Sequence, residues 1–417
     1  MTQAAAAAAT TDGDLANLYR DLHRHPELGY QEHRTSGIVA SHLQELGIEV
    51  TTGIAQTGVA GVLRNGPGPT ALLRADMDAL PVKEATGLDY ASTETATDAQ
   101  GRTVPVDHAC GHDLHTTCLL GAARALVADP SSWSGTLVFA FQPAEELGSG
   151  AQSMVDDGLY DRVPRPDVVL GQHVAPLPAG TIAAHAGAAY AGSDSLLVRL
   201  HGRGAHGSMP QNSIDPIVMA AEAVLRLQAI VSREIAATDV VVLTVGSLNA
   251  GDAANVIPDH ADLQLNIRTY DDAVRTHVLK SVQRVLNGVA EAAGAPQPPE
   301  ITPTERFPVV VNDAEALGRT LAVFREWLGA DKVFDPGAGA GSEDVGILAT
   351  AAGAPLSYWL LGGSDPTLFT TGGLDDPALR TVPSNHSPAY APVIEPTLGL
   401  GIEALTRAAR EWLPART

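Results

Sequence analysis

Hydrophobic positions in the first half of the chain follow two different periods. Apolar residues recur at helical spacing across residues 15–22 and 38–46, and the second of these predicted helices ends near Gly47. Four short apolar runs are typical of strands, and a further helix is predicted between them over residues 116–127. The runs cover residues 59–63, 71–74, 137–141 and 168–170. Strands that alternate with helices predict an α/β layer structure.

The pattern changes after about residue 184, where a second set of elements begins. Their order is strand, helix, strand, strand, helix, over residues 195–202, 214–235, 240–248, 261–270 and 272–293. This order is compatible with a small α+β module of the ferredoxin-like kind. The segment Gly294-Ala-Pro-Gln-Pro-Pro299 is typical of a linker, and helix and strand signals resume near residue 307. We therefore expect an outer domain in two parts, residues 1–186 and 300–417, with residues 187–299 inserted as a separate module.

Length and charge narrow the class of protein. A chain of 417 residues exceeds the size at which one hydrophobic core usually stops growing, so two domains are expected. Apolar residues make up 45% of the chain and charged residues 18%, which argues against wholesale disorder. The 48 acidic residues outnumber the 26 basic ones, and a net charge of -22 argues against nucleic acid or a membrane as the main partner.

Cysteine content and the N-terminal segment bear on location. Two cysteines, Cys110 and Cys118, are too few for a disulfide framework, which favours a reducing compartment. The first fifteen residues contain no Lys or Arg and no strongly apolar run, so they do not resemble a signal peptide. We expect residues 2–12 to form a frayed tail. No stretch is apolar and long enough to span a bilayer, and the cytoplasm is the expected location.

The densest chemical motif is His108-Ala-Cys-Gly-His-Asp-Leu-His115. Thiolate and imidazole are good ligands for zinc and similar divalent ions, and a thiolate has enough lone pairs to bridge two cations. Cys110 and His112 are separated only by Gly111, and in a loop this spacing lets both face one point. The alternative interpretation is that a His-rich segment merely begins the following helix. Cys118 lies among leucines and is expected to pack in the core.

Two pairs of carboxylates follow apparent strands. Glu145 and Glu146 come just after residues 137–141, where one could bind metal while its neighbour moves protons. Asp76 and Asp78 alternate at strand spacing, so both face one side where they could hold a metal ion or orient a ligating imidazole. Taken alone, Glu145-Glu146 is typical of an acidic surface turn, and an Asp-rich turn before Pro81 explains the aspartates equally well.

Single polar residues elsewhere are candidates because of where they lie. His173 follows an apolar run at an apparent strand end, where α/β sheets place their sites, and His386 lies between two prolines. In the inserted module, the Gly-rich segment around His206 is interpreted as a loop that presents this side chain. Asn255 and Arg268 could contact a substrate carboxylate. A structural or surface histidine remains the alternative for His173 and His386, and a surface ion pair for Arg268.

Taken together, these motifs resemble the amidohydrolase branch of the aminoacylase and carboxypeptidase-like zinc metallopeptidases. That branch includes hippurate hydrolases, indole-acetyl-amino-acid hydrolases and N-acyl-amino-acid amidohydrolases. The resemblance covers nearly the whole chain in order and rests on the segments His23–Gly29, Arg74–Pro81, His108–Asp113, Gln142–Glu146, Gly204–His206, Asn255–Pro258, Gly341–Asp344 and His386–Pro388. It implies a discontinuous α/β catalytic domain with a mixed sheet flanked by helices, plus an inserted α+β ferredoxin-like domain that serves as lid and dimerisation module.

The resemblance also implies a cofactor and its ligands. It implies two divalent metal ions per subunit, drawn from Zn, Mn, Co or Ni. The implied ligands are Cys110, His112, Glu146, His173 and His386, with Cys110 shared between the two ions. Relatives in the wider clan often have a metal-binding histidine where Asp76 stands, and in this branch His112 takes over that role.

The remaining site residues receive roles from the same resemblance. Glu145 is implied to be the general base that deprotonates a water and later protonates the leaving amine, and Asp78 to orient a ligand. His206 is implied to contact the substrate or its oxyanion, commonly from the partner subunit. Asn255 and Arg268 are implied as further substrate contacts. A homodimer acting on a small N-acylated amino acid is therefore expected.

Three other functions remain open at this level. A dipeptidase or carboxypeptidase of the same clan would share the motifs. Cys110 could instead be a covalent nucleophile activated by a nearby histidine. A non-catalytic metal-binding protein could be built on the same fold. The sequence does not define the acyl group, the amino acid or the native metal.

Overall fold

The computed structural model describes residues 13–370 and 376–415, and the tail expected at residues 2–12 lies outside the described residues. The chain divides into two compact units. The first comprises Met1–Ala189, Val311–Gly337 and Asp344–Thr417, and the second comprises Tyr190–Val310 with Ala338–Glu343. The second unit therefore interrupts the first twice along the chain.

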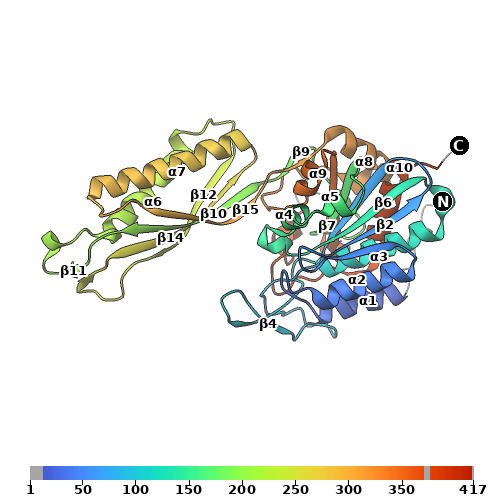
Figure 1. Cartoon of the computed structure of the whole chain (residues 1–417), viewed down its shortest axis with the longest axis horizontal. Coiled ribbons are helices and arrows are strands. Elements are labelled where there is room, and N and C mark those ends of the chain that lie inside the picture. Colours follow the sequence, from blue (N-terminus) through green and yellow to red (C-terminus); the bar gives the residue numbers. More distant parts are fainter. Residues whose placement is uncertain (1–12, 371–375, 416–417) are drawn as a thin grey trace. The chain divides into compact units, whose positions relative to one another are not determined.

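The first unit is organised around an eight-stranded mixed sheet, and three of its strands, β2, β6 and β7, are labelled in Figure 1. Its strands β6, β3, β7 and β18 run parallel at the centre, and β2 and β1 continue it antiparallel at one side. In sheet order the strands are β1 (Glu49–Ile54), β2 (Gly58–Asn65), β6 (Gly135–Gln142), β3 (Thr70–Asp76), β7 (Val168–Pro178), β18 (Leu356–Ser364), β8 (Ile182–Ala183) and β17 (Val333–Phe334). The expected mixed sheet is confirmed.

Helices flank this sheet in two groups. One group contributes its apolar side chains to the main hydrophobic core together with the central strands. It consists of α1 (Gly13–Arg24), α2 (His33–Glu45), α3 (His112–Ala128), α8 (Ala314–Leu328) and α10 (Ile394–Trp412). In the other group, α4 (Gly150–Asp156) and α9 (Gly346–Ala352) contact each other and pack on β6 and β7, respectively, and the short α5 (Leu159–Arg162) contacts α4.

The central strands are buried along nearly their whole length, which explains their continuous apolar sequences. Because β3, β6 and β7 are parallel, their carboxyl ends lie at the same edge of the sheet. Asp76 at the end of β3 pairs with Gln142 at the end of β6. Polar side chains that follow three separate strands are thereby brought to one place.

The second unit has the element order βαββαβ (Figure 1). Its sheet has the antiparallel order β12-β14-β10-β15, and α6 and α7 pack against it. The main elements are β10 (Gly192–His201), α6 (Pro216–Arg233), β12 (Val241–Asn249), β14 (His260–Thr269), α7 (Asp272–Ala293) and β15 (Glu300–Phe307), and the short strands β11 (Ala205–His206) and β13 (Val256–Ile257) form a separate pair. Numbered along the chain, the strands lie in the order 2-3-1-4, the arrangement of a ferredoxin-like module.

One expected boundary differs from the structure. Residues 294–299 were predicted to link the two domains, but they join α7 to β15 inside the second unit. The strand β15 pairs with β10 from Ser193↔Phe307 to Arg199↔Glu300, so the unit continues to Val310. Among the described residues, no helix combines the length and apolar character that crossing a bilayer requires.

Candidate metal centre

The centre is built around the loop that leads into α3. The helix begins at His112, four residues before the predicted start, so His112 and His115 share its first turn. Gly111 precedes the helix with φ 84° and ψ 23°, a left-handed conformation that glycine adopts without strain. A Cβ at Gly111 would lie 2.4 Å from Cγ1 of Val174, so the loop also needs a residue without a side chain.

His112 is held in one orientation by Asp78. Its Nδ1 lies 3.2 Å from Oδ1 of Asp78, a carboxylate that can only accept, so the ring proton is at Nδ1. Nε2 of His112 then faces the two glutamates, 3.8 Å from Oε1 of Glu146 and 4.0 Å from Oε2 of Glu145. This nitrogen is buried and has no hydrogen-bond partner among the described residues.

Cys110 and His173 meet on the other side of the loop. The strand β7 runs beyond the predicted end to Pro178, and His173 lies two residues past Gly171, where the pairing of β7 with β3 stops. Nδ1 of His173 donates to the carbonyl of Val174 at 2.7 Å, which turns Nε2 toward Sγ of Cys110 at 3.5 Å. His173 reaches the site because the pairing of β7 with β3 has already stopped there, and not because β7 itself ends there.

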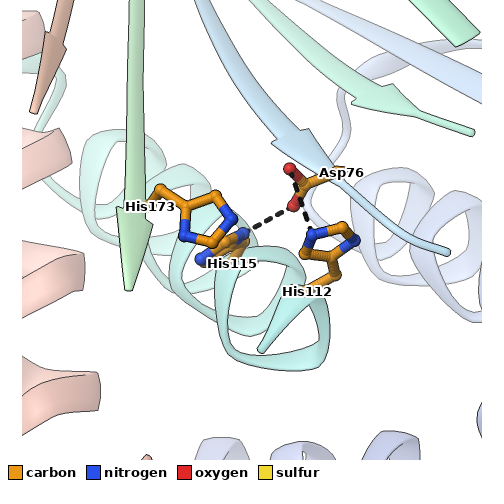
Figure 2. Close-up of side chains that lie close together, drawn as sticks. All are labelled: Asp76, His112, His115 and His173. Carbon is orange, nitrogen blue, oxygen red and sulfur yellow. Dashed lines mark hydrogen bonds and ion pairs between the residues drawn. The ribbon is translucent and has the colours of Figure 1, made fainter. Parts of the chain in front are cut away.

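His115 and Asp76 lie beside these residues but are occupied by other contacts (Figure 2). The backbone N–H of Val174 donates to Nε2 of His115 at 2.8 Å, so the ring proton is at Nδ1, which donates to Asp76 at 2.5 Å. Oδ2 of Asp76 accepts from the guanidinium of Arg74 at 2.5 Å. Both ring nitrogens of His115 are used within the protein, which argues against a ligand role.

Glu146 joins the remaining two residues. One of its oxygens lies 3.3 Å from Nε2 of His386, and ligand atoms of Cys110, Glu146 and His386 all lie within 4.8 Å of one another. His386 has a φ of 69°, and its backbone N–H donates to the carbonyl of Ala109 at 2.8 Å. The structure therefore gathers all five residues for which a ligand role was expected.

The electrostatics of this cluster favour positive charge. Burial opposes the charged form of His112, but the negative charges of Asp76 and Cys110 outweigh it and hold the pKa of this imidazole well above its ordinary value. Hydrogen bonds to Cys110 and Glu146 raise the pKa of His386 to about 10. A field that favours an added proton at these nitrogens also favours a divalent cation between them.

The residues present fit the expected metal ions. One sulfur, three imidazole nitrogens and one carboxylate form a donor set suited to Zn²⁺ and related ions. The unpartnered Nε2 of buried His112 is best explained by a ligand, because buried polar atoms are normally satisfied. The hydrogen bond that Nδ1 on the far side of this ring donates to Asp78 matches the way proteins orient metal-binding histidines.

Glu145 lies next to the cluster on the short turn Glu145–Leu147 that follows β6. Glu145 is 5% exposed. Its carboxylate and the ligand atoms of His112 and Glu146 all lie within 4.8 Å of one another. The chain there passes from β6 through Ala144, and Glu145 and Glu146 point to one site from adjacent positions. This placement suits a proton acceptor beside a ligand.

A buried ionic network that the sequence did not reveal supports β3 and β6. Arg74 donates to Gln142 through Nε at 2.9 Å and to Asp344 through Nη2 at 3.2 Å, besides its bond to Asp76. Asp344 also accepts from Gln142 at 2.7 Å and from the backbone of Ala151 at 2.9 Å. Asp344 ends the segment Gly341–Asp344 on which the family resemblance partly rests, and this network gives its side chain a structural role. The sequence showed an acidic residue at this position but not the residues that it contacts.

The expected substrate contacts His206, Asn255 and Arg268 lie in the second unit. Ser208 donates to Nδ1 of His206 from its backbone N–H at 3.1 Å, so the exposed ring carries its proton at Nε2. The carbonyl of Asn255 accepts from Gly207 at 2.8 Å. Arg268 is engaged inside the unit, with Nη1 2.7 Å from the carbonyl of Ala340.

Substituting Gly111 by alanine is expected to destabilise the protein by about 1–3 kcal/mol, because the added methyl group meets Val174 and must displace Cys110 or His112. Metal content should fall with stability. Urea unfolding and elemental analysis measure both. Gly47→Ala is the matched control, because Gly47 has a φ of 74° but no atom within 4 Å of its would-be Cβ. Equal behaviour of the two variants would contradict this account of the loop.

The chain is similar to known proteins over much of its length. The family described as peptidase family M20/M25/M40 matches residues 72–372. An N-acetyl-L-cysteine deacetylase of Bacillus subtilis is 38% identical over 285 residues, covering 68% of this chain and 66% of the relative. A hippurate hydrolase of Campylobacter jejuni is 38% identical over 319 residues, covering 76% of this chain and 80% of the relative.

A solved structure extends the similarity to nearly the whole chain. The YXEP protein of Bacillus subtilis, described as a dinuclear metal-binding peptidase of the M20 family, superimposes with a TM-score of 0.75 at 28% identity. The match covers 97% of this chain and 99% of that structure.

Proposed function

Because this chain belongs to peptidase family M20/M25/M40 and is a hydrolase of amide bonds, we propose that it hydrolyses small N-acylated amino acids with the help of two divalent metal ions. The observation that carries the proposal is the convergence of Cys110, His112, Glu146, His173 and His386 beside Glu145. The names of the deacetylase and hippurate hydrolase relatives support the substrate class.

Cys110, His112, Glu146, His173 and His386 would hold the two ions. Divalent cations supply Lewis acidity to an amide oxygen and to an attacking water. A Cys/His/Glu donor set accepts several divalent ions, among them Zn²⁺, Mn²⁺, Co²⁺ and Ni²⁺.

Glu145 performs the proton transfers in this proposal. Its carboxylate lies beside the ligands His112 and Glu146 and is nearly buried, so it accepts a proton from the attacking water and passes it to the leaving nitrogen. Asp78 contributes by fixing the ring of His112 and by accepting the backbone N–H of Glu146 at 3.0 Å. Glu145 therefore moves the proton, and Asp78 orients the ring of His112 and the backbone of Glu146.

We propose that His206, Asn255 and Arg268 of the second unit contact the substrate, and that His206 does so from the partner subunit. With its proton at Nε2, His206 can donate to the oxyanion of the tetrahedral intermediate. Asn255 and Arg268 are proposed as contacts to the substrate carboxylate. The hydrogen bonds that Arg268 donates to Ala340 and Ser342 support an additional role, which is to hold the segment Ala338–Glu343.

A substrate panel tests the proposed class. N-acetyl, N-benzoyl, indole-acetyl and long-chain acyl amino acids should be assayed with each of Mn²⁺, Zn²⁺, Co²⁺ and Ni²⁺, alongside unblocked dipeptides. We expect the highest kcat/KM among the N-acylated compounds. Faster hydrolysis of dipeptides with a free amino group would contradict it.

We also propose that the protein is a homodimer in the cytoplasm, with the second unit as its interface. Within the part of the chain that the structure describes, the strand β12 lies at the edge of its sheet, next to β14. Exposed apolar side chains lie on this strand and on α6, including Val242 at 50% and Leu225 at 74% exposure. An unpaired strand edge beside exposed apolar residues is typical of an interaction surface.

Light scattering after size exclusion is expected to give twice the 43.2 kDa mass of the chain. The double variant Val242→Lys, Leu225→Lys should shift the mass toward a monomer, because charges oppose burial of the edge and the helix. Leu368→Lys is the matched control, since Leu368 is 54% exposed but lies in the first unit. A wild-type monomer, or an unchanged dimer in the double variant, would contradict the interface.

A further inference from the structure

The backbone immediately before Glu145 adopts an unfavourable conformation. Ala144 has a φ of 50° and a ψ of 41°, in the left-handed region that residues with a Cβ rarely adopt. It is fully buried and connects the end of β6 to the turn Glu145–Leu147. Such a conformation persists only where the surroundings hold it, and it occurs here next to the proposed general base.

A buried carboxylate holds this residue. Oε1 of Glu32 accepts the backbone N–H of Ala144 at 2.8 Å, and Oε2 accepts the hydroxyl of Thr57 at 2.6 Å. Glu32 is 0% exposed, so both oxygens are committed to partners inside the protein. The contact joins residues 112 positions apart.

The position of Glu32 shows that this contact has a purpose other than helix capping. Glu32 is the N-cap residue of α2, yet its side chain makes no capping bond. Glu27 caps the helix instead, because its two carboxylate oxygens accept hydrogen bonds from the backbone N–H groups of Arg34 and Thr35 at 2.9 and 2.8 Å. A carboxylate buried at a helix start but turned away from the helix is directed to Ala144 instead.

A second carboxylate holds the other side of Glu145. Oδ2 of Asp78 accepts the N–H of Glu146 at 3.0 Å, and the carbonyl of Ala144 accepts the N–H of Gly150 at 3.1 Å. The residue between Ala144 and Glu146 is therefore fixed from both neighbours. Loss of the hydrogen bond that Ala144 donates to Glu32 would release only the side of Glu145 that Asp78 does not hold.

We propose that Glu32 is a positioning residue for Glu145, which it serves by locking Ala144 in the left-handed conformation that aims the Glu145 carboxylate. The inference rests on the proposed function, in which Glu145 moves the proton. It assigns no contact between Glu32 and substrate or metal. It explains why a fully buried carboxylate is retained at a helix start that another residue caps.

Three variants of the full-length, metal-loaded protein test this role. Glu32→Ala is expected to lower kcat by about 10²-fold, the loss typical of a small misplacement of a reacting group. KM should change little and the metal content should stay at the wild-type value, because no ligand is touched. Glu32→Gln should restore most of kcat, since its amide oxygen can accept from Ala144 and its NH₂ can donate to Thr57. Glu27→Ala, which removes an equivalent carboxylate-to-backbone contact, should leave kcat and KM unchanged.

The outcomes separate this inference from the proposed function. Wild-type kcat in Glu32→Ala, or a Glu32→Gln variant as slow as Glu32→Ala, would overturn the positioning role even if Glu145→Gln is inactive. Activity retained in Glu145→Gln would instead overturn the proposed function. If Glu32→Ala does not fold, Thr57→Val keeps the shape of the site and removes only the hydroxyl that orients Glu32. That variant should lower kcat by a smaller factor, and an unchanged kcat would count against the role.

Discussion

Replacing Glu145 by glutamine is expected to lower kcat by about 10²- to 10⁴-fold, the usual contribution of a positioned general base. Glutamine keeps the size and polarity of the side chain but cannot accept a proton at the reaction pH. The metal content should stay at the wild-type value, because the proposed ligands next to Glu145 are Glu146 and His112. Steady-state kinetics and elemental analysis of the same preparation measure both quantities.

The neighbouring glutamate provides the control for this prediction. Glu146→Gln removes a proposed ligand that also lies 3.3 Å from His386, so it should lose metal together with activity. The two variants differ by one position but should separate loss of the base from loss of the ions. Turnover at the wild-type rate in Glu145→Gln would contradict the assignment, and so would equal metal loss in both variants.

Removing the metal ions is expected to abolish hydrolysis altogether. Dialysis against a chelator should give an inactive protein, and addition of Mn²⁺, Zn²⁺ or Co²⁺ should restore activity, because in the proposed function the ions would supply Lewis acidity. Cys110→Ser should weaken metal binding by more than the about 10- to 100-fold that follows loss of an outer contact to a ligand. Elemental analysis and a metal titration of activity measure these effects.

The two cysteines distinguish this mechanism from covalent catalysis. Cys118 is buried in the core, with Sγ 3.7 Å from the carbonyl of Leu398, so Cys118→Ser should keep the wild-type metal content. Alkylation of Cys110 should be blocked by bound metal and permitted after chelation. Full activity of the chelated protein, with inactivation by alkylation of Cys110, would show that the thiolate is the nucleophile instead.

The site was predictable from the sequence where its residues are close in the chain or follow apolar strands. Cys110 and His112 flank Gly111, and Glu145 and Glu146 follow within a few residues of the end of β6. The carboxyl ends of parallel strands lie together, so Asp76, Asp78 and His173 could be expected near them. His386 had no such local support, and only the family resemblance placed it at the site.

Contacts between distant residues could not be predicted in this way. Arg74 and Asp344 are 270 positions apart and Glu32 and Ala144 are 112 apart, and no local periodicity relates such pairs. The extent of β7 was also hidden, because Gln172 and His173 interrupt its apolar run while pairing with β18 continues the strand. Pairing of β15 with β10 likewise outweighed the linker-like composition of residues 294–299.

Anomalous diffraction from crystals of the protein grown with Mn²⁺ or Zn²⁺ tests the central claim most directly, because it locates each ion. The account predicts two peaks next to Glu145, each at about 2.0–2.3 Å from the nearest ligand atoms. Cys110 should lie between the ions, with His112, Glu146, His173 and His386 completing their coordination. No peak at this position, or ions bound only by other residues such as the His23–Glu84–Asp107 cluster, would contradict it.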